Sequence, residues 1–123
     1  MKEPVLVAVV DDDESVRESL PDLLREFGFA VEAFASAEAF LASPCKAQAR
    51  CLILDMVMPG LSGPDLLKAL HAGGHAIPVI FITANADACQ HPRLPRAGVV
   101  DCLAKPFSEA QLLKALSAAL PVD

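Results

Sequence analysis

Short apolar runs alternate with longer segments of helical period along most of the chain. The apolar runs, which favour β-strands, occupy residues 5–10, 30–34, 51–55, 77–84 and 99–104. A strand that is apolar at nearly every position is buried on both faces, whereas a strand with one wet face alternates apolar and polar residues. The pattern therefore predicts a parallel sheet with helices packed on both sides.

The segments between these runs carry helix start and stop signals. Ser36 and Ser108 stand where N-cap residues belong, and Gly28 and Gly73 stand where helices end. The last segment has a predicted apolar stripe of four leucines, which are Leu112, Leu113, Leu116 and Leu120. Helices are thus expected after the first, second, third and fifth strands.

The segment 85–98 stands where the alternation places a fourth helix. Pro92 and Pro95 lie in its second half, and each removes a backbone donor that a regular helix would use. We therefore predict an irregular fourth helical segment.

Five strands and five helical segments predict an α/β fold, a (βα)5 doubly wound five-stranded parallel sheet. The expected strand order is the flavodoxin-like 2-1-3-4-5, and residues 1–123 are expected to form a single domain. In this order the winding reverses between the first and third strands, so a functional crevice is expected at their carboxyl ends.

Composition narrows the function classes. No apolar run approaches the roughly 18–20 residues that cross a bilayer, and the first residues make a poor signal peptide, so we expect a cytoplasmic protein without a membrane span. The formal net charge of −6 opposes attraction to phosphate backbones, so this domain is not expected to bind nucleic acid directly. A protein partner or a cation fits this charge better.

The four cysteines, Cys45, Cys51, Cys89 and Cys102, have no C-x-x-C spacing. This spacing favours neither a zinc site nor a disulfide framework. We expect them to be reduced thiols in the core or at the surface.

Ionisable and hydroxyl residues gather where the predicted strands end. The first strand is followed by residues 11–13, all aspartates; Asp55 ends the third strand, Thr83 stands near the end of the fourth, and Lys105 follows the fifth. Crowded carboxylates need protons or a cation among them, and an all-oxygen cluster selects a hard ion. We predict Mg²⁺, because no calcium-binding loop is present. Asp13 fits a helix N-cap better than a metal ligand.

These strand-end residues together suit phosphoryl transfer. Asp55, on the central strand, is best placed as the nucleophile of an aspartyl phosphate. The turn after it would present the backbone carbonyl of Val57 as a further metal ligand, so the predicted metal set is Asp11, Asp12, Asp55 and Val57. Lys105 adds a positive charge, and Thr83 adds a neutral hydroxyl donor.

The chain resembles the receiver domain of bacterial two-component response regulators over essentially its whole length. The resemblance rests on "VVDDDESVRESL", "LILDMVMPGLSG", "VIFITA" and "AKPF", in this order and at matching spacings. It implies Asp11 and Asp12 as the acidic pair, Asp55 as the phosphoacceptor, Thr83 as the switch hydroxyl and Lys105 as the lysine that contacts phosphate. These roles match those expected from the residues alone.

The resemblance also implies partners. The domain would take its phosphoryl group from a histidine kinase or a phosphotransfer protein. It would signal to an effector domain or a partner protein, as a monomer or a phosphorylation-dependent dimer, and would be a signalling module rather than an enzyme. It further implies metal ligation by Asp12, Asp55 and the Val57 carbonyl, and a cis bond between Lys105 and Pro106.

Two features depart from the family pattern. The position three residues before Lys105 is usually aromatic, and here it is Cys102; the fourth helical segment carries "HPRLP". We therefore expect activation to be read through rearrangement of residues 84–99 rather than through a side-chain rotation at Cys102.

Two alternative functions remain. A phosphoaspartate hydrolase of the haloacid-dehalogenase type needs a second aspartate two residues after the nucleophile, where Val57 stands, so it is disfavoured. A flavodoxin-like pseudo-receiver would act as an interaction module that is independent of phosphorylation.

Overall fold

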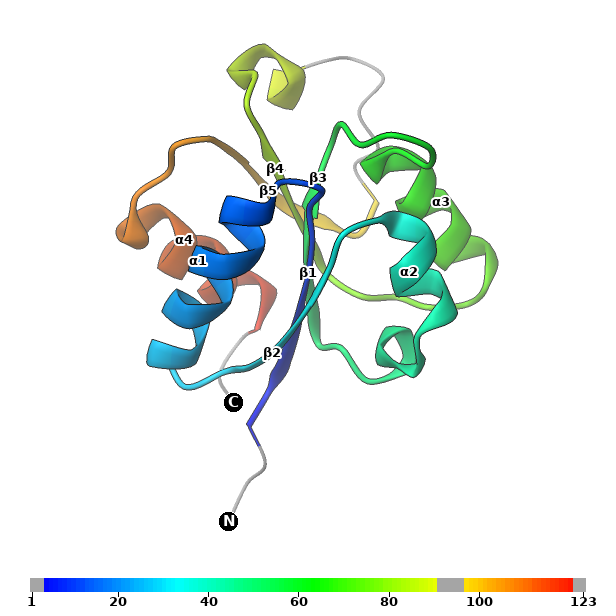
Figure 1. The fold of residues 1–123 in the computed structure, drawn as a ribbon, viewed down its shortest axis with the longest axis horizontal. Coiled ribbons are helices and arrows are strands. Elements are labelled where there is room, and N and C mark those ends of the chain that lie inside the picture. The colour runs from blue at the N-terminus through cyan, green and yellow to red at the C-terminus, as the bar shows by residue number, and fades with distance from the viewer. Residues whose placement is uncertain (1–3, 91–96, 121–123) are drawn as a thin grey trace.

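The computed structural model describes residues 4–90 and 97–120 and shows the predicted parallel sheet (Figure 1). Its strands are β1 (Leu6–Val10), β2 (Ala30–Phe34), β3 (Cys51–Asp55), β4 (Val79–Thr83) and β5 (Val99–Ala104). They pair in parallel in the order β2-β1-β3-β4-β5, which confirms the flavodoxin-like order.

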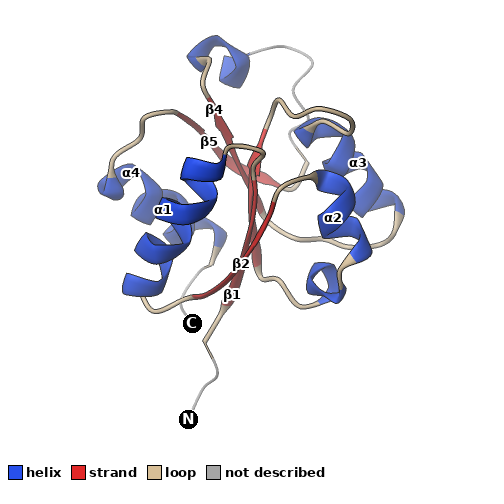
Figure 2. Cartoon of the chain, viewed as in Figure 1, coloured by secondary structure: helices blue, strands red, loops and turns tan. Residues whose placement is uncertain are grey.

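Helices cover both faces of the sheet (Figure 2). One face carries α1 (Glu14–Glu26) and α4 (Glu109–Ala119), and the other carries α2 (Ala37–Ala42) and α3 (Gly63–Ala72). β3 and β4 are buried at every position, so each contributes side chains to both core layers. This double burial explains why their sequences lack alternation.

Polar side chains cap the helices at the expected places. Asp13, Ser36 and Ser62 each accept a hydrogen bond from a backbone N–H in the first turn of α1, α2 and α3. Ser108 forms a reciprocal capping box with Gln111 at the start of α4. These caps satisfy backbone donors that the helices leave free at their N-termini.

One detail of the predicted elements is wrong. Leu113 was assigned to the apolar stripe of the last helix, but it is 42% exposed. α4 instead buries small and large residues together, at positions spaced i, i+3, i+4 and i+7, namely Leu112, Ala115, Leu116 and Ala119. A 3₁₀ turn at Pro44–Ala47 follows α2.

The expected irregular fourth segment is present as a 3₁₀ turn, η2 (Ala86–Gln90), which has no buried residue. Pro92 and Pro95, on which the prediction of irregularity rested, lie outside the described residues. Among the helices in residues 4–90 and 97–120, none combines the length and apolar composition needed to cross a membrane.

The prediction that all four cysteines are reduced is wrong, because Cys89 and Cys102 form a disulfide. The spacing rule considers cysteines close together in the sequence, whereas these two are 13 residues apart. Adjacent pairing of β4 and β5 brings η2, which follows β4, against the Cys102 strand. Cys45 and Cys51 are free thiols and are buried, as expected for core cysteines.

Candidate functional site

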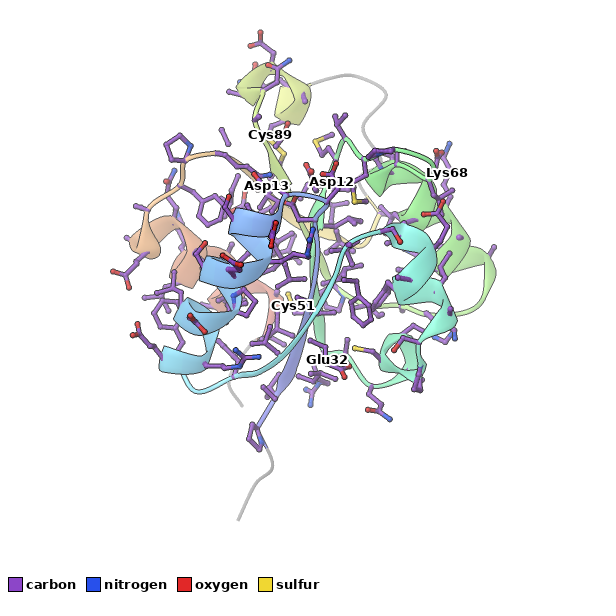
Figure 3. The ribbon with its side chains drawn as sticks, viewed as in Figure 1. Asp12, Asp13, Glu32, Cys51, Lys68 and Cys89 are labelled. Atoms are coloured by element: carbon purple, nitrogen blue, oxygen red, sulfur yellow. A yellow bond between two sulfur atoms is a disulfide. The ribbon has the colours of Figure 1, made fainter. Side chains whose placement is uncertain are left out.

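The strand register brings the predicted acidic residues together at one edge of the sheet. Val10, the last residue of β1, pairs with Leu54, so Asp11 and Asp55 follow at the same level. One carboxylate oxygen from each of Asp11, Asp12 and Asp55 lies within 4.8 Å of the others. Asp11 and Asp55 are buried. Asp12 is exposed and lies in the short connection between β1 and α1 (Figure 3).

Asp11 is held in place from three directions. Its carboxylate accepts a hydrogen bond from the backbone N–H of Asp13 at 2.9 Å and an ion-pair contact from Lys105 Nζ at 2.8 Å. Its backbone carbonyl accepts a hydrogen bond from Arg17 Nη1 at 3.0 Å. These contacts fix a carboxylate that is fully buried and would otherwise be costly to keep charged.

Asp55 lies beside Asp11, and Lys105 is close to both carboxylates. Lys105 Nζ is 3.9 Å from Asp55 Oδ2, and the backbone N–H of Val57 donates to Asp55 Oδ1 at 3.4 Å. Burial, followed by the negative charge of Asp11, raises the pKa of Asp55 from 3.8 to about 6, although Lys105 and the Val57 N–H oppose the shift. The site therefore carries more negative charge than its one lysine offsets.

This raised pKa makes a stability prediction for the metal-free protein. Because the folded state holds the Asp55 proton more tightly than the unfolded state, stability from this group is complete below about pH 4 and is lost as pH rises through about 6. We expect the loss to be roughly 1–3 kcal/mol, at about 1.4 kcal/mol per pKa unit. Urea unfolding between pH 4 and 8 in a chelator, on wild type and Asp55→Asn, measures it. A constant difference between the two proteins over this range would contradict the assignment.

Asp13 lies outside the acidic cluster and serves as the N-cap of α1. Its carboxylate accepts hydrogen bonds from both the backbone N–H and the hydroxyl of Ser15, at 2.9 and 2.8 Å. The Ser15 side chain is the main reason that the pKa of Asp13 is lowered from 3.8. The cap role predicted for Asp13 is therefore confirmed.

The loop after Asp55 is anchored by two residues that the sequence analysis missed. Gly63 lies so close to β3 that a methyl group there would overlap the backbone carbonyl of Asp55, and its N–H donates to Met56 O at 3.2 Å. Glu38 of α2 accepts a hydrogen bond from the Leu61 N–H at 3.2 Å. The Pro-Gly and Ser-Gly pairs of this turn, at 59–60 and 62–63, are sequence signals that could have indicated a tight turn here. No sequence signal links Glu38 to the loop.

Val57 protrudes from this loop and is 74% exposed. Its backbone N–H faces Asp55, so the main chain of this residue adjoins the acidic cluster. This placement is compatible with the expected use of its carbonyl, and the apolar side chain is left at the surface.

Thr83 reaches the same edge, but its hydroxyl is engaged with its own loop. The hydroxyl donates to the backbone carbonyl of Asn85 at 3.3 Å and accepts from the Asn85 N–H at 3.1 Å. The Thr83 carbonyl accepts a hydrogen bond from the Lys105 N–H at 2.7 Å, which ties the ends of β4 and β5 together. The Lys105–Pro106 peptide bond is cis, as the resemblance implied.

The donor set of this edge determines its chemistry. Three carboxylates converge without any imidazole or thiolate ligand in the group, and this favours a hard divalent cation over zinc or copper. Phosphoryl transfer requires a nucleophile, a cation and further positive charge close together, and at this edge the three carboxylates lie beside the Lys105 ammonium. The residues present thus fit a metal-assisted phosphoryl site.

Comparisons with known proteins agree with this geometry. Residues 7–117 match the model of the response regulator receiver domain family. The response regulator protein TodT of Pseudomonas putida is 42% identical over 115 residues, which cover 94% of this chain and 51% of TodT. The transcriptional regulatory protein FixJ of Azorhizobium caulinodans is 41% identical over 120 residues, covering 98% of this chain and 57% of FixJ.

Solved structures show the same likeness. The response regulator StyR superposes with a TM-score of 0.87 at 47% identity, over 96% of this chain and 60% of StyR. The chain thus spans about half the length of the curated relatives it matches. With the receiver model matched over nearly its whole length and the acidic cluster in place, this chain belongs to the response regulator receiver domain family.

Proposed function

We propose that Asp55 is the phosphoacceptor of this receiver domain and takes a phosphoryl group from a histidine kinase or a phosphotransfer protein. The observation that carries the proposal is the position of Asp55, which lies beside Asp11 and Asp12 and 3.9 Å from Lys105 Nζ, at the carboxyl end of the central strand. The pseudo-receiver alternative is not favoured, because a crevice that had lost its function would have no need of this complete set of groups.

Mg²⁺ fits the donor set best. Asp11, Asp12 and Asp55 would hold the ion, with the backbone carbonyl of Val57 as a further oxygen. When bound, it supplies positive charge that offsets the carboxylates and the oxygens of the incoming phosphoryl group.

The protein residues then position and neutralise the reacting groups. An Asp55 carboxylate oxygen attacks phosphorus in line, and the bond from phosphorus to the donor breaks on the opposite side. Lys105, which bridges Asp11 and Asp55, lies within reach of a phosphoryl oxygen on Asp55 and would stabilise its charge. The Thr83 hydroxyl would donate to another phosphoryl oxygen once it leaves Asn85.

The relatives support a proposal about the role of the whole protein. FixJ is a transcriptional regulatory protein, and the part it shares with this chain covers 57% of its length. We propose that phosphorylation of this domain controls an effector domain or partner protein, and that this domain itself makes no contact with nucleic acid. The single-domain span of 1–123, the oligomeric state and the cytoplasmic location stay predictions.

The magnesium site makes a prediction with a matched control. We expect Asp12→Ala to lower Mg²⁺ affinity at least about tenfold, because it removes one of three converging carboxylates. Asp13→Ser keeps a capping hydroxyl one residue away and leaves the cluster intact, so its affinity should match wild type. Isothermal titration calorimetry with MgCl₂ measures both. Equal affinity in wild type and Asp12→Ala would overturn the site assignment.

A further inference from the structure

The disulfide joins two neighbouring elements, η2 and β5. Cys89 lies in η2, and Cys102 lies in β5, at the edge of the sheet. Their Cα atoms are 5.6 Å apart, a distance typical of bridged cysteines. Both residues are partly exposed, whereas Cys45 and Cys51 are buried.

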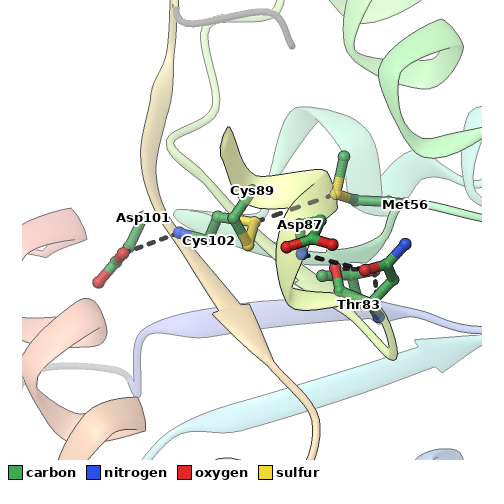
Figure 4. Close-up of a disulfide and its surroundings, with 7 residues drawn as sticks. Met56, Thr83, Asp87, Cys89, Asp101 and Cys102 are labelled. Carbon is green, nitrogen blue, oxygen red and sulfur yellow. Dashed lines mark hydrogen bonds between the residues drawn. A yellow bond between two sulfur atoms is a disulfide. The ribbon is translucent and has the colours of Figure 1, made fainter. Parts of the chain in front are cut away.

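The Cys89 end of the disulfide is linked to the Thr83 hydroxyl through hydrogen bonds within one turn of the chain (Figure 4). That hydroxyl is bonded to the backbone of Asn85, whose side chain accepts from the Asp87 N–H at 3.0 Å and whose carbonyl accepts from the Ala88 N–H at 3.0 Å. Cys89 is the next residue. The turn that hydrogen-bonds the Thr83 hydroxyl is therefore the same turn that the disulfide attaches to β5.

The other end of the bridge adjoins the Asp55 strand. Cys102 pairs in register with Phe81 of β4, and its Sγ lies 3.9 Å from the Sδ of Met56. Met56 is the residue that follows Asp55. The bridge thus contacts the residue that follows Asp55, and its Cys89 end lies in the turn that begins at the hydrogen-bond partner of the Thr83 hydroxyl.

We propose that Cys89 and Cys102 are a reversible dithiol–disulfide pair, whose oxidation fixes η2 on β5 and restrains the loop that must move when Asp55 is phosphorylated. The second half of this proposal rests on the proposed function of Asp55. It assigns a redox-controlled modification site to η2 and β5, and one of the two cysteines, Cys102, stands where the family usually has an aromatic residue.

A small-molecule disulfide such as oxidised glutathione is a sufficient oxidant. One cysteine thiolate attacks a sulfur of this disulfide, which forms a mixed disulfide and releases one thiol. The second cysteine thiolate attacks the protein sulfur, which forms the Cys89–Cys102 bond and releases the second thiol. The protein thiols lose two electrons and two protons, and the small-molecule disulfide gains them.

The other two cysteines should not take part. Burial raises the pKa of both the Cys45 and the Cys51 thiol to about 12, so neither forms a thiolate readily near neutral pH. Both side chains are also enclosed in the core. The chemistry is therefore confined to the pair near the site.

The restraint follows from how η2 is held. For the Thr83 hydroxyl to reach a phosphoryl oxygen, its two bonds to Asn85 must break, and this loosens the start of η2. No residue of η2 is fully buried, so in the dithiol form only the partial packing of Ala88 and the contacts of η2 with β4 and β5, together with local hydrogen bonds, oppose this movement. In the disulfide form, Cys89 is covalently bonded to Cys102 of β5, so η2 cannot move away from this strand.

The first test measures whether the pair titrates. The protein is equilibrated with mixtures of reduced and oxidised glutathione, its free thiols are alkylated, and peptides are quantified by mass spectrometry. We expect Cys89 and Cys102 to become alkylated together as the mixture becomes reducing, and the labelling of Cys45 and Cys51 to stay constant. A bridge absent even in oxidised glutathione, or one that persists in excess dithiothreitol in the native protein, would overturn reversibility.

The second test measures coupling to the site. Hydrogen exchange of residues 84–90 is followed in the oxidised and reduced proteins, with and without beryllofluoride as a mimic of the phosphoryl group. We expect exchange in this segment to be at least about tenfold faster in the reduced protein, and the change caused by beryllofluoride to be several-fold larger there. Cys89→Ala and Cys102→Ala should each behave as the reduced protein under oxidising conditions.

The outcomes separate this proposal from the proposed function. A beryllofluoride effect on the loops around Asp55 that is equal in both redox states, with residues 84–90 unchanged, would refute the redox restraint and leave the phosphoacceptor role standing. A lack of any beryllofluoride effect in either state, with Mg²⁺ present, would contradict the phosphoacceptor role and the coupling that rests on it. Reversibility of the bridge is judged by the first test alone.

Discussion

The Asp55→Asn variant is expected to accept no phosphoryl group from acetyl phosphate or from a phosphorylated histidine kinase. An amide lacks the anionic oxygen that attacks phosphorus, so the rate should fall by more than about 1000-fold. The variant should fold, because the amide keeps the size of the carboxyl group and removes the repulsion between residue 55 and Asp11. Incorporation of labelled phosphate, with circular dichroism as the folding check, measures this.

Asp22→Asn is the matched control for this experiment. Asp22 is an exposed carboxylate of α1 that contacts Arg25 at 3.4 Å and lies outside the acidic cluster, so its variant should be phosphorylated as wild type. A label that persists on Asp55→Asn would contradict the assignment; an acid-stable label would point to serine chemistry, and an acid-labile, base-stable label to histidine chemistry.

Gly63→Ala is expected to destabilise the fold and to displace the end of β3 at Asp55. The added methyl group would overlap the Asp55 carbonyl and lie 3.0 Å from Met56 Cα, and both are main-chain atoms that cannot move aside as a flexible side chain can. We expect the free energy of unfolding to fall by about 2–3 kcal/mol, the upper part of the range for overpacking. Urea denaturation measures this loss.

Gly73→Ala, at the other end of α3, provides the control. A methyl group there would lie 3.3 Å from the His75 ring, a side chain that can shift, and the backbone φ of −85° is one that alanine adopts freely. Its stability should stay within about 1 kcal/mol of wild type. If the two variants lost equal stability, the close approach of α3 to Asp55 would not be the cause.

The sheet was predictable because its strands are short, apolar and separated by clear helix signals. β2, β3 and β5 begin and end where the apolar runs do, and Ser36 and Ser108 cap the helices as expected. The strand order followed from the general behaviour of parallel α/β sheets, in which alternating helices must cover both faces. Leu113 was misassigned because helical spacing alone does not say where a narrow buried stripe ends.

The carboxylate cluster was also predictable, since the ends of parallel strands meet at one edge. Asp11, Asp12 and Asp55 do converge, and Lys105 reaches Asp11 and Asp55. The hydrogen-bond partner of the Thr83 hydroxyl could not be predicted, because it depends on the path of the loop rather than on the strand.

Contacts between distant parts of the chain escaped prediction for the same reason. Glu38 accepts a hydrogen bond from the N–H of Leu61, which lies 23 residues later in the sequence. Cys89 bonds to Cys102 because the fold places η2 against β5. Motif spacing can predict contacts only between residues that are close together in the sequence. These pairs are brought together by the fold itself.

The most direct test of the phosphoacceptor role is to locate the phosphoryl group chemically. The protein is incubated with acetyl phosphate and Mg²⁺ and then treated with sodium borohydride, which reduces an aspartyl phosphate to homoserine. Peptide mass spectrometry should find homoserine at position 55 and aspartate at positions 11 and 12. Phosphorylated protein with intact aspartate at position 55, or homoserine at another position, would contradict the role assigned to Asp55.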